Sequence, residues 1–366
     1  MKKVGIITIP DYNNYGNRLQ NYAVKRVFEK LGYTVETLEL NDKAFPNYKA
    51  RKWKLWLKKI KLFPIVFLFI WLKEGFYKAQ RYKCFEKFTL RYLSVTFTPT
   101  YNESIVNNLK NEYSYFVLGS DQIWHPHINS TPTLYFGEFA KQVQRICFAP
   151  SFGVTKISDK YRDIVIKYLV NINKLSVREE SGAKIIKEIT GRDATVLIDP
   201  TMMLNAEEWD EIAQCPKNKP KQKYILGCFL GHMNTEYKEY INEVSLKIGV
   251  TIFHIAQINN KEGYVTGPSE FIWYLKNSAI VCTDSFHTVV FAILFNKPFI
   301  VFPRLTEDNI SDGLDSRLDT LLNKFCLTNR KNGLVDKNSL FTCDYGNVRK
   351  TLNHEREQVY NFFSDL

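Results

Sequence analysis

The sequence predicts the α/β class, with two doubly wound, Rossmann-like domains that face each other across a cleft. Three observations predict this fold. Short apolar runs alternate with segments of helical periodicity, polar residues follow the runs at their carboxyl ends, and a Pro/Lys/Asn-rich stretch near 216–222 separates two such series. A chain of 366 residues with 45% hydrophobic content can bury two cores. We place the domains at 1–205 and 206–366.

The first domain begins with a βαβ unit. The run VGIITI (4–9) predicts a buried strand, a helix follows over about 18–31 with Gly32 as its stop, and TVETLEL (34–40) predicts the next strand. This order predicts a parallel sheet. Further strands that end in polar loops are expected at 113–124, at 146–153, just before Arg178 and at 195–201, with helices over about 158–173 and up to Ile189.

The second domain repeats the alternation. Strands are expected at 223–231, 251–256, 279–284 and 297–302, with helices at about 235–248, 268–276 and 285–295. A last helix near 345–364 is free to cross back to the first domain. Because ligands bind at the carboxyl edge of open parallel sheets, the polar residues after these strands are the candidate site residues.

The net charge of +12 is concentrated in one basic, aromatic insertion at about 43–91, which holds fourteen Lys or Arg and two Glu. Trp53, Trp56 and Ile60 share one face of a helix that Pro64 should end, and lysines share the other face. The apolar run that follows, 63–72, is too short to span a bilayer. We expect residues 51–72 to attach to an anionic membrane surface. The alternative is a core helix pair with a solvated lysine face. Nucleic-acid binding is not expected, because no nucleic-acid motif accompanies the charge.

The cysteines and the start of the sequence predict the compartment. Seven cysteines without CxxC spacing argue against disulfides and a zinc knuckle. The first apolar run spans only about six residues, shorter than a signal peptide requires. We therefore expect no signal peptide and a cytoplasmic protein, peripheral at the inner face of the cell membrane.

Six strings in this order carry a family resemblance: NYGNRLQNYAVKRVFEKLG, VLGSDQIW, SVREES, LIDPTMML, TDSFHT and DSRLDTLL. Together they resemble the polysaccharide pyruvyl transferase family over about residues 4–327. The resemblance implies a fold similar to the GT-B glycosyltransferases, with the site in the cleft. It also implies phosphoenolpyruvate as donor, a sugar or lipid-linked glycan as acceptor, and a pyruvyl ketal as product. Thr288, where members often have glycine, is expected to narrow the pocket or to mark a different acceptor.

The donor needs fixed cations and a proton-transfer group. Arginine matches carboxylate and phosphate through its planar fork, and histidine titrates near neutral pH. We expect His287 to be the catalytic acid/base and, with Arg178, Arg317 and Ser285, to bind the donor. The alternatives are a packed His287, an Arg178 paired with Glu179 or Glu180, and Arg317 as a surface charge. Asp284 could orient a side chain or cap the following helix.

The acceptor site is expected at two loops of the first domain. Asn14, Gly16, Asn17 and Arg18 lie before a helix, where backbone amides favour anions, although the loop lacks the GxGxxG fingerprint. The alternative for Arg18 is a solvated helix face. Gly119, Ser120 and Asp121 follow a strand. Asp121 is a second catalytic candidate that would position a sugar hydroxyl. The alternative is that Asp121 caps the next segment. Asp199 is expected to end a strand and fix the hinge.

No metal or other cofactor is expected. His125 and His127 have the spacing of a metal pair but no third ligand, so we leave them out of the site. A nucleotide-sugar-dependent GT-B glycosyltransferase is the alternative function, with Glu270 as the candidate ribose ligand. A non-catalytic membrane scaffold is the third hypothesis.

Overall fold

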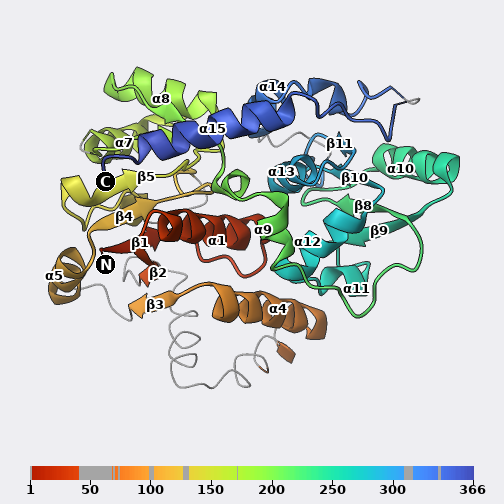
Figure 1. The fold of residues 1–366 in the computed structure, drawn as a ribbon, viewed down its shortest axis with the longest axis horizontal. Helices are drawn as coiled ribbons and strands as arrows, with labels where there is room; N and C mark the ends of the chain where they lie inside the picture. The colour runs from red at the N-terminus through yellow and green to blue at the C-terminus, as the bar shows by residue number, and fades with distance from the viewer. Residues whose placement is uncertain are drawn as a thin grey trace. The chain divides into compact units, whose positions relative to one another are not determined.

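The chain divides into two compact units in a computed structural model that describes residues 2–40, 68, 71–72, 75–98, 103–126, 132–170, 172–308, 316–336 and 339–366 (Figure 1). The first unit comprises residues 1–203 and 356–366, and the second comprises residues 204–355. Most of the segment 51–72, for which we expect membrane attachment, lies outside the described residues. Within the described ranges, no helix is long and apolar enough to cross a membrane.

A parallel sheet of five strands forms the centre of the first unit. Its order is β3-β2-β1-β4-β5, and every neighbouring pair is parallel. The strands are β1 (Lys3–Ile7), β2 (Thr34–Leu40), β3 (Val95–Thr98), β4 (Tyr115–Leu118) and β5 (Arg145–Cys147). A shorter parallel pair, β6 (Ser176–Val177) and β7 (Thr195–Val196), follows in the chain. The central strands β1 and β4 are almost wholly buried, as their unbroken apolar runs predict.

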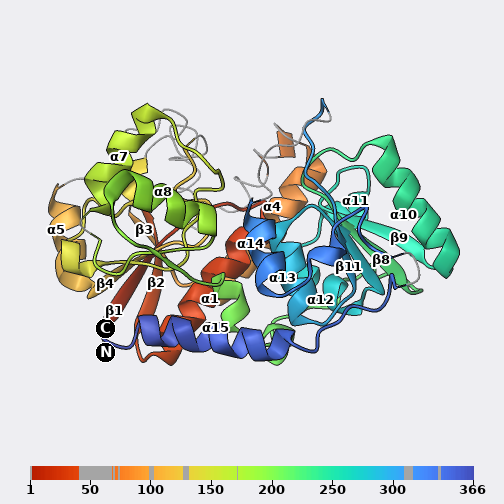
Figure 2. The same ribbon diagram turned by 90° about the horizontal axis from the view of Figure 1, so that it is seen from above.

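Helices cover this sheet on both faces. Figure 2 shows α7 and α8 on one side of the strands and α1 on the opposite side. The helices are α1 (Tyr15–Lys30), α4 (Phe76–Tyr92), α5 (Glu103–Glu112), α6 (Pro132–Tyr135), α7 (Asp159–Leu169) and α8 (Glu180–Thr190). Helix α1 begins earlier than predicted, because Asn14 is its N-cap. The Asn14 side chain accepts a hydrogen bond from the backbone amide of Asn17 at 3.2 Å. Helix α4, strand β3 and helix α5 were not predicted from the sequence.

The end of the chain completes the core of the first unit. Helix α15 (Val348–Phe362) begins in the second unit, and residues from Arg356 onward belong to the first. Phe363 is buried, with its ring centroid 5.2 Å from that of Phe28 and 5.1 Å from that of Phe148. Arg356 also donates to the carbonyl of Met202 at 2.8 Å.

The second unit is built on a parallel sheet of four strands in the order β11-β10-β8-β9. The strands are β8 (Tyr224–Cys228), β9 (Thr251–Ile255), β10 (Ile280–Thr283) and β11 (Phe299–Val301). Their positions match the four predicted strands. The α/β class, with a parallel sheet in each half of the chain, is therefore confirmed.

The helices of the second unit include one that is buried on all sides. They are α9 (Ala206–Asp210), α10 (Thr235–Ile248), α11 (Lys261–Tyr264), α12 (Pro268–Asn277), α13 (Phe286–Leu294) and α14 (Ser316–Lys324), together with the first part of α15. Every residue of α13 is buried, which its sequence FHTVVFAIL predicts because it has no polar face. Phe291 of α13 packs edge-on against Trp209 of α9, with ring centroids 4.8 Å apart.

We predict that Phe363→Ala lowers the free energy of unfolding by about 3–5 kcal/mol, because it removes a buried ring from between two others. The neighbouring Phe362→Ala is the control. Phe362 is only partly buried, so the same truncation should cost less than about 1.5 kcal/mol there. Urea unfolding of the full chain measures both. Equal losses would show that the chain end is not part of this core.

Candidate active site

The direction in which successive strands are added to the sheet of the first unit reverses at one point. From β1 the chain moves to β2 and β3 on one side, whereas β4 and β5 lie on the other side of β1. The loops after β1 and β4 therefore leave the sheet in opposite directions at the carboxyl ends of these strands. Ligands of open α/β sheets bind at such a switch point.

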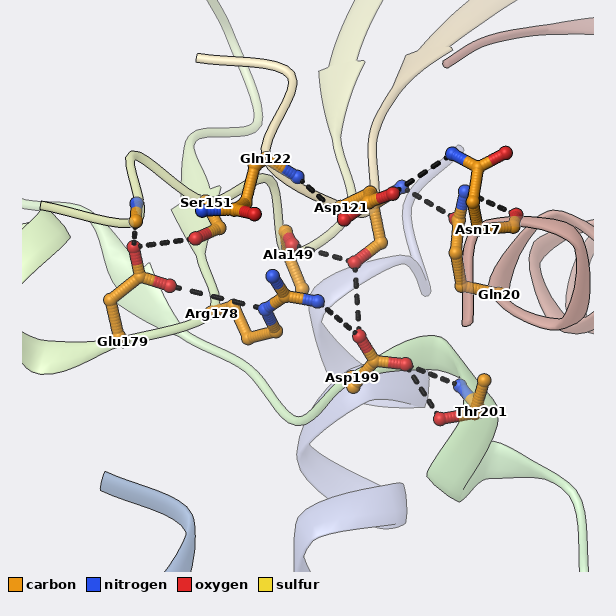
Figure 3. A network of polar contacts seen from close by, with 12 residues as sticks. Asn17, Gln20, Asp121, Gln122, Ala149, Ser151, Arg178, Glu179, Asp199 and Thr201 are labelled. Carbon is orange, nitrogen blue, oxygen red and sulfur yellow. Dashed lines mark hydrogen bonds and ion pairs between the residues drawn. The ribbon is translucent and has the colours of Figure 1, made fainter. Parts of the chain in front are cut away.

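A buried network of polar side chains occupies this switch point (Figure 3). The side-chain amide of Asn17 donates to Asp121 Oδ2 at 2.8 Å. This hydrogen bond joins the N-terminal turn of α1 to the loop after β4. Gln20, one turn further along α1, accepts from the Ser120 backbone amide at 3.0 Å and donates to the Thr8 hydroxyl at 2.9 Å. The predicted acceptor residues Asn17, Ser120 and Asp121 thus come together.

Glycine is required at position 119. Its φ is +116°, and an added Cβ would lie 2.7 Å from the carbonyl oxygen of Phe148. Asp121 also has a positive φ, of 72°, and its Oδ1 accepts from the Gln122 amide at 2.9 Å. The backbone here turns tightly away from β4 and places the Asp121 carboxylate beside α1. Its expected action on a sugar hydroxyl stays a prediction.

Arg178, the predicted donor-binding cation, lies at the same network in a buried ion pair. Its Nη1 is 2.7 Å from Asp199 Oδ2, and both side chains are almost wholly buried. Burial lowers the pKa of Arg178, but the carboxylates of Asp199, Glu179 and Asp121 raise it by more, so the guanidinium remains charged. The expected donor contact of Arg178 stays a prediction, and the described geometry gives the residue a structural partner as well.

The two carboxylates beside Arg178 have different partners. Asp199 Oδ1 accepts from the Thr201 amide and hydroxyl at 2.9 and 2.6 Å, and its Oδ2 also accepts from the Ser120 hydroxyl at 3.2 Å. Glu179 lies 4.0 Å from Arg178 Nε, and its Oε1 accepts from Ser151 and two backbone amides. Asp199, Glu179 and Gln20 were not among the predicted site residues. The helical spacing of Gln20 from Asn17, i and i+3, is the sequence signal that could have identified it.

Arg18 is wholly buried, so the alternative of a solvated helix face is wrong. Its Nη2 donates to the Ile9 carbonyl at 3.0 Å and to Asn17 Oδ1 at 2.6 Å, and its guanidinium carbon lies 5.1 Å from the centroid of the Tyr12 ring. The guanidinium therefore fixes the loop before α1. Asn14 and Gly16 lie at the start of the same helix.

The second unit has a switch point of the same kind. The chain passes from β8 to β9 on one side, and from β10 to β11 on the other. The switch point therefore lies at the carboxyl ends of β8 and β10, and the string TDSFH begins with Thr283, the last residue of β10.

Asp284 connects the two strand ends. Its oxygens accept from the backbone amides of Leu230 and Gly231 at 2.8 and 2.7 Å, and Arg304 Nη2 donates to its backbone carbonyl at 3.1 Å. Burial raises the pKa of Asp284, although Arg304 and the amides oppose this shift. Ser285, rather than Asp284, is the N-cap of α13, with its hydroxyl accepting from Thr288 at 3.5 Å.

His287 and Arg317 meet at the ring of Phe286. The rings of Phe286 and His287 are 5.3 Å apart and nearly perpendicular, and the Arg317 guanidinium carbon lies 5.9 Å from the Phe286 centroid. Both side chains are buried, so the alternative of Arg317 as a surface charge is wrong. The Thr288 hydroxyl donates to the Cys228 sulfur at 3.3 Å. The predicted donor residues Ser285, His287 and Arg317 therefore belong to one cluster.

A hollow of about 510 Å³ lies beside the Asp284 contact. Gly231 lines it and also donates to Asp284. Both apolar and polar residues line it: Leu230, His232, Met233, Lys238, Gln257, Ile258, Asn259, Leu305, Thr306 and Glu307. A space of this size, lined by apolar and polar residues, can accommodate a sugar or a small phosphorylated acid.

The described residues contain no group of three His, Cys, Asp or Glu side chains placed to hold a metal ion. His125 is buried, and His127 lies outside the described residues. Glu270, the ribose candidate of the alternative function, lies in the first turn of α12.

The sequence model of the family described as polysaccharide pyruvyl transferase matches residues 14–305. The chain belongs to this family. The match includes Asn17, Asp121 and the whole of TDSFHT, but it begins after β1 and ends before Arg317. No match was found among curated proteins.

The chain is also similar to solved structures at low sequence identity. HepE of Anabaena in complex with UDP is 10% identical, with a TM-score of 0.47 and full coverage of both chains. A glycosyltransferase of Rickettsia africae is 10% identical, with a TM-score of 0.44 and full coverage of both chains. A functionally uncharacterised protein of Klebsiella pneumoniae is 13% identical, with a TM-score of 0.44 and 90% coverage of each chain.

We predict that Asp199→Asn destabilises the protein by about 3–5 kcal/mol, because it removes the counter-ion of a buried guanidinium. Asp193→Asn is the control, since Asp193 pairs with Lys187 at an exposed site and should contribute at most about 1 kcal/mol. Chemical denaturation at pH 7 compares the two variants. A loss below about 1 kcal/mol for Asp199→Asn would contradict the structural role of the ion pair.

Proposed function

We propose that the protein transfers the pyruvyl group of phosphoenolpyruvate to a sugar of a cell-surface or capsular polysaccharide, or of its precursor, and forms a ketal. The single observation that supports this best is the cluster of His287 and Arg317 around Phe286, at the N-terminus of α13 and the switch point of the second unit. Membership of the family gives the reaction class, and the cluster has the chemistry that the donor needs.

The donor carries a carboxylate and a phosphate. In the proposal, Arg317 binds one of these anions through its planar fork, and the N-terminal amides of α13 with the Ser285 hydroxyl bind the other. The helix has nine residues and no acidic residue in its first turn, so its N-terminal end favours an anion.

The reaction requires proton transfers in both directions. A first sugar hydroxyl adds to C2 of the enol and loses its proton, while C3 gains a proton and becomes a methyl group. A second hydroxyl of the same sugar then attacks C2 and loses its proton, the C2–O bond to phosphate breaks, and inorganic phosphate leaves with that second proton. In the proposal, His287 is the acid/base for these transfers, because an imidazole can both donate and accept a proton near neutral pH.

The acceptor is assigned to the network of the first unit. Asp121 is the carboxylate that would accept a hydrogen bond from a sugar hydroxyl, and Asn17 holds it at 2.8 Å. Arg18, Gly119 and Ser120 are buried and would position the loops, whereas Asn14 and Gly16 lie at the start of α1.

We predict that His287→Gln lowers kcat by about 100-fold or more, because it removes the proton-transfer group while keeping a polar side chain of similar size. The measurement follows phosphate release and the mass gain of one pyruvyl group on candidate glycans. His354→Gln, at an exposed position of α15, is the control and should leave the rate unchanged. Full activity in His287→Gln, or tight nucleoside-diphosphate binding without phosphate release from the wild type, would contradict the proposal.

We predict that Arg317→Ala raises KM for phosphoenolpyruvate by about 10- to 100-fold, because a charge-assisted hydrogen bond to the donor is lost. Arg317→Lys should recover only part of this loss, since the ammonium group lacks the fork. Arg349→Ala, at an exposed position of the second unit, is the matched control. An unchanged KM in both Arg317 variants would remove Arg317 from the donor site.

A further inference from the structure

Helix α4 has two unlike faces. Its inner face packs on the start of α1, where Arg81 donates to the Tyr15 hydroxyl at 2.8 Å and to the Asn13 carbonyl at 2.6 Å. Arg81 is buried, and the rings of Tyr15 and Phe85 stack with centroids 5.3 Å apart. These contacts fix the orientation of the helix, and Figure 1 shows it at the margin of its unit, next to α1.

The outer face of α4 is cationic. The helix has six exposed residues, of which four are basic and two apolar: Phe76, Lys78, Lys83, Lys87, Leu90 and Arg91. Its one acidic residue, Glu86, is buried. Five of the six exposed residues fall on one side of the helix, at steps of seven, four, three and one residues along the chain. We name these five the α4 stripe: Phe76, Lys83, Lys87, Leu90 and Arg91.

An aromatic anchor adjoins one end of the α4 stripe. Trp71 and Phe76 are 47% and 46% exposed, and their rings meet edge-on with centroids 6.3 Å apart. Leu72 is 77% exposed, and Leu90, near the other end of the stripe, is 76% exposed. Large apolar side chains are therefore interleaved with cations along about 21 Å of helix.

We propose that the α4 stripe and its aromatic anchor dock the protein on an anionic lipid surface. The basic side chains match the negative charge of the headgroups, and exposed tryptophan, phenylalanine and leucine can enter the interface between headgroups and acyl chains. A nucleic acid would satisfy the cations but would leave the leucines in water, so the composition favours a bilayer.

Vesicle sedimentation with the full chain tests this proposal without any enzyme activity. One set of vesicles is phosphatidylcholine alone, and the other contains about 30% phosphatidylserine. We expect sedimentation only with the anionic vesicles, and its loss in high salt. In the variant K83Q/K87Q/R91Q the partition coefficient should fall by about 100-fold, since three cations near the surface are removed. Trp71→Ala should reduce it further.

The matched control is K217Q/K219Q/K221Q, which removes the same charge from three exposed positions between α9 and β8. It should bind vesicles like the wild type. Equal sedimentation with both lipid mixtures, or equal effects of the two triple variants, would overturn the proposal. So would binding to single-stranded RNA without binding to vesicles, or attachment that survives in K83Q/K87Q/R91Q and is lost in Trp53→Ala/Trp56→Ala.

Discussion

The reversal of winding in each parallel sheet is the constraint on which the rest of the structure depends. Parallel strands are connected by crossovers, and in each of these sheets the direction of the crossovers reverses once, so the loops diverge at that point. In the first unit this point lies between β1 and β4, and in the second between β8 and β10. The string GSDQ follows β4 directly, and the string TDSFH begins with Thr283, the last residue of β10. The candidate site residues therefore collect at two strand ends, because the direction of the crossovers reverses there.

The two switch points are stabilised in different ways. In the first unit a buried guanidinium, Arg178, lies among carboxylates that raise its pKa, and the network around it joins β4, β6 and α1. In the second unit Asp284 joins β8 and β10 through two backbone amides, and an aromatic ring joins His287 to Arg317. The first arrangement is suited to rigid positioning. The second places an imidazole and a guanidinium at a helix N-terminus, where an anion is favoured.

Periodicity and strand-end polarity were sufficient to predict the α/β class and the four strands of the second unit. The donor site of Arg178, Arg317, Ser285 and His287 came from the family strings and stays a prediction. These patterns did not predict that Arg178 pairs with Asp199, because the partners lie 21 residues apart and burial is a tertiary property. Arg18 and Arg317 show the same limit, since a charged residue on a short amphipathic segment is usually solvated. Helix α4 was missed because a basic composition obscured its buried face. The GT-B-like arrangement of the two domains around a cleft stays a prediction.

We propose that the donor anion binds at the switch point of the second unit. A crystal structure after soaking with phosphoenolpyruvate tests it most directly. We predict electron density for the anion at the N-terminus of α13, with its oxygens within hydrogen-bonding distance of Arg317 and His287. Density for the anion at any other place, with both of these side chains out of reach, would contradict the claim.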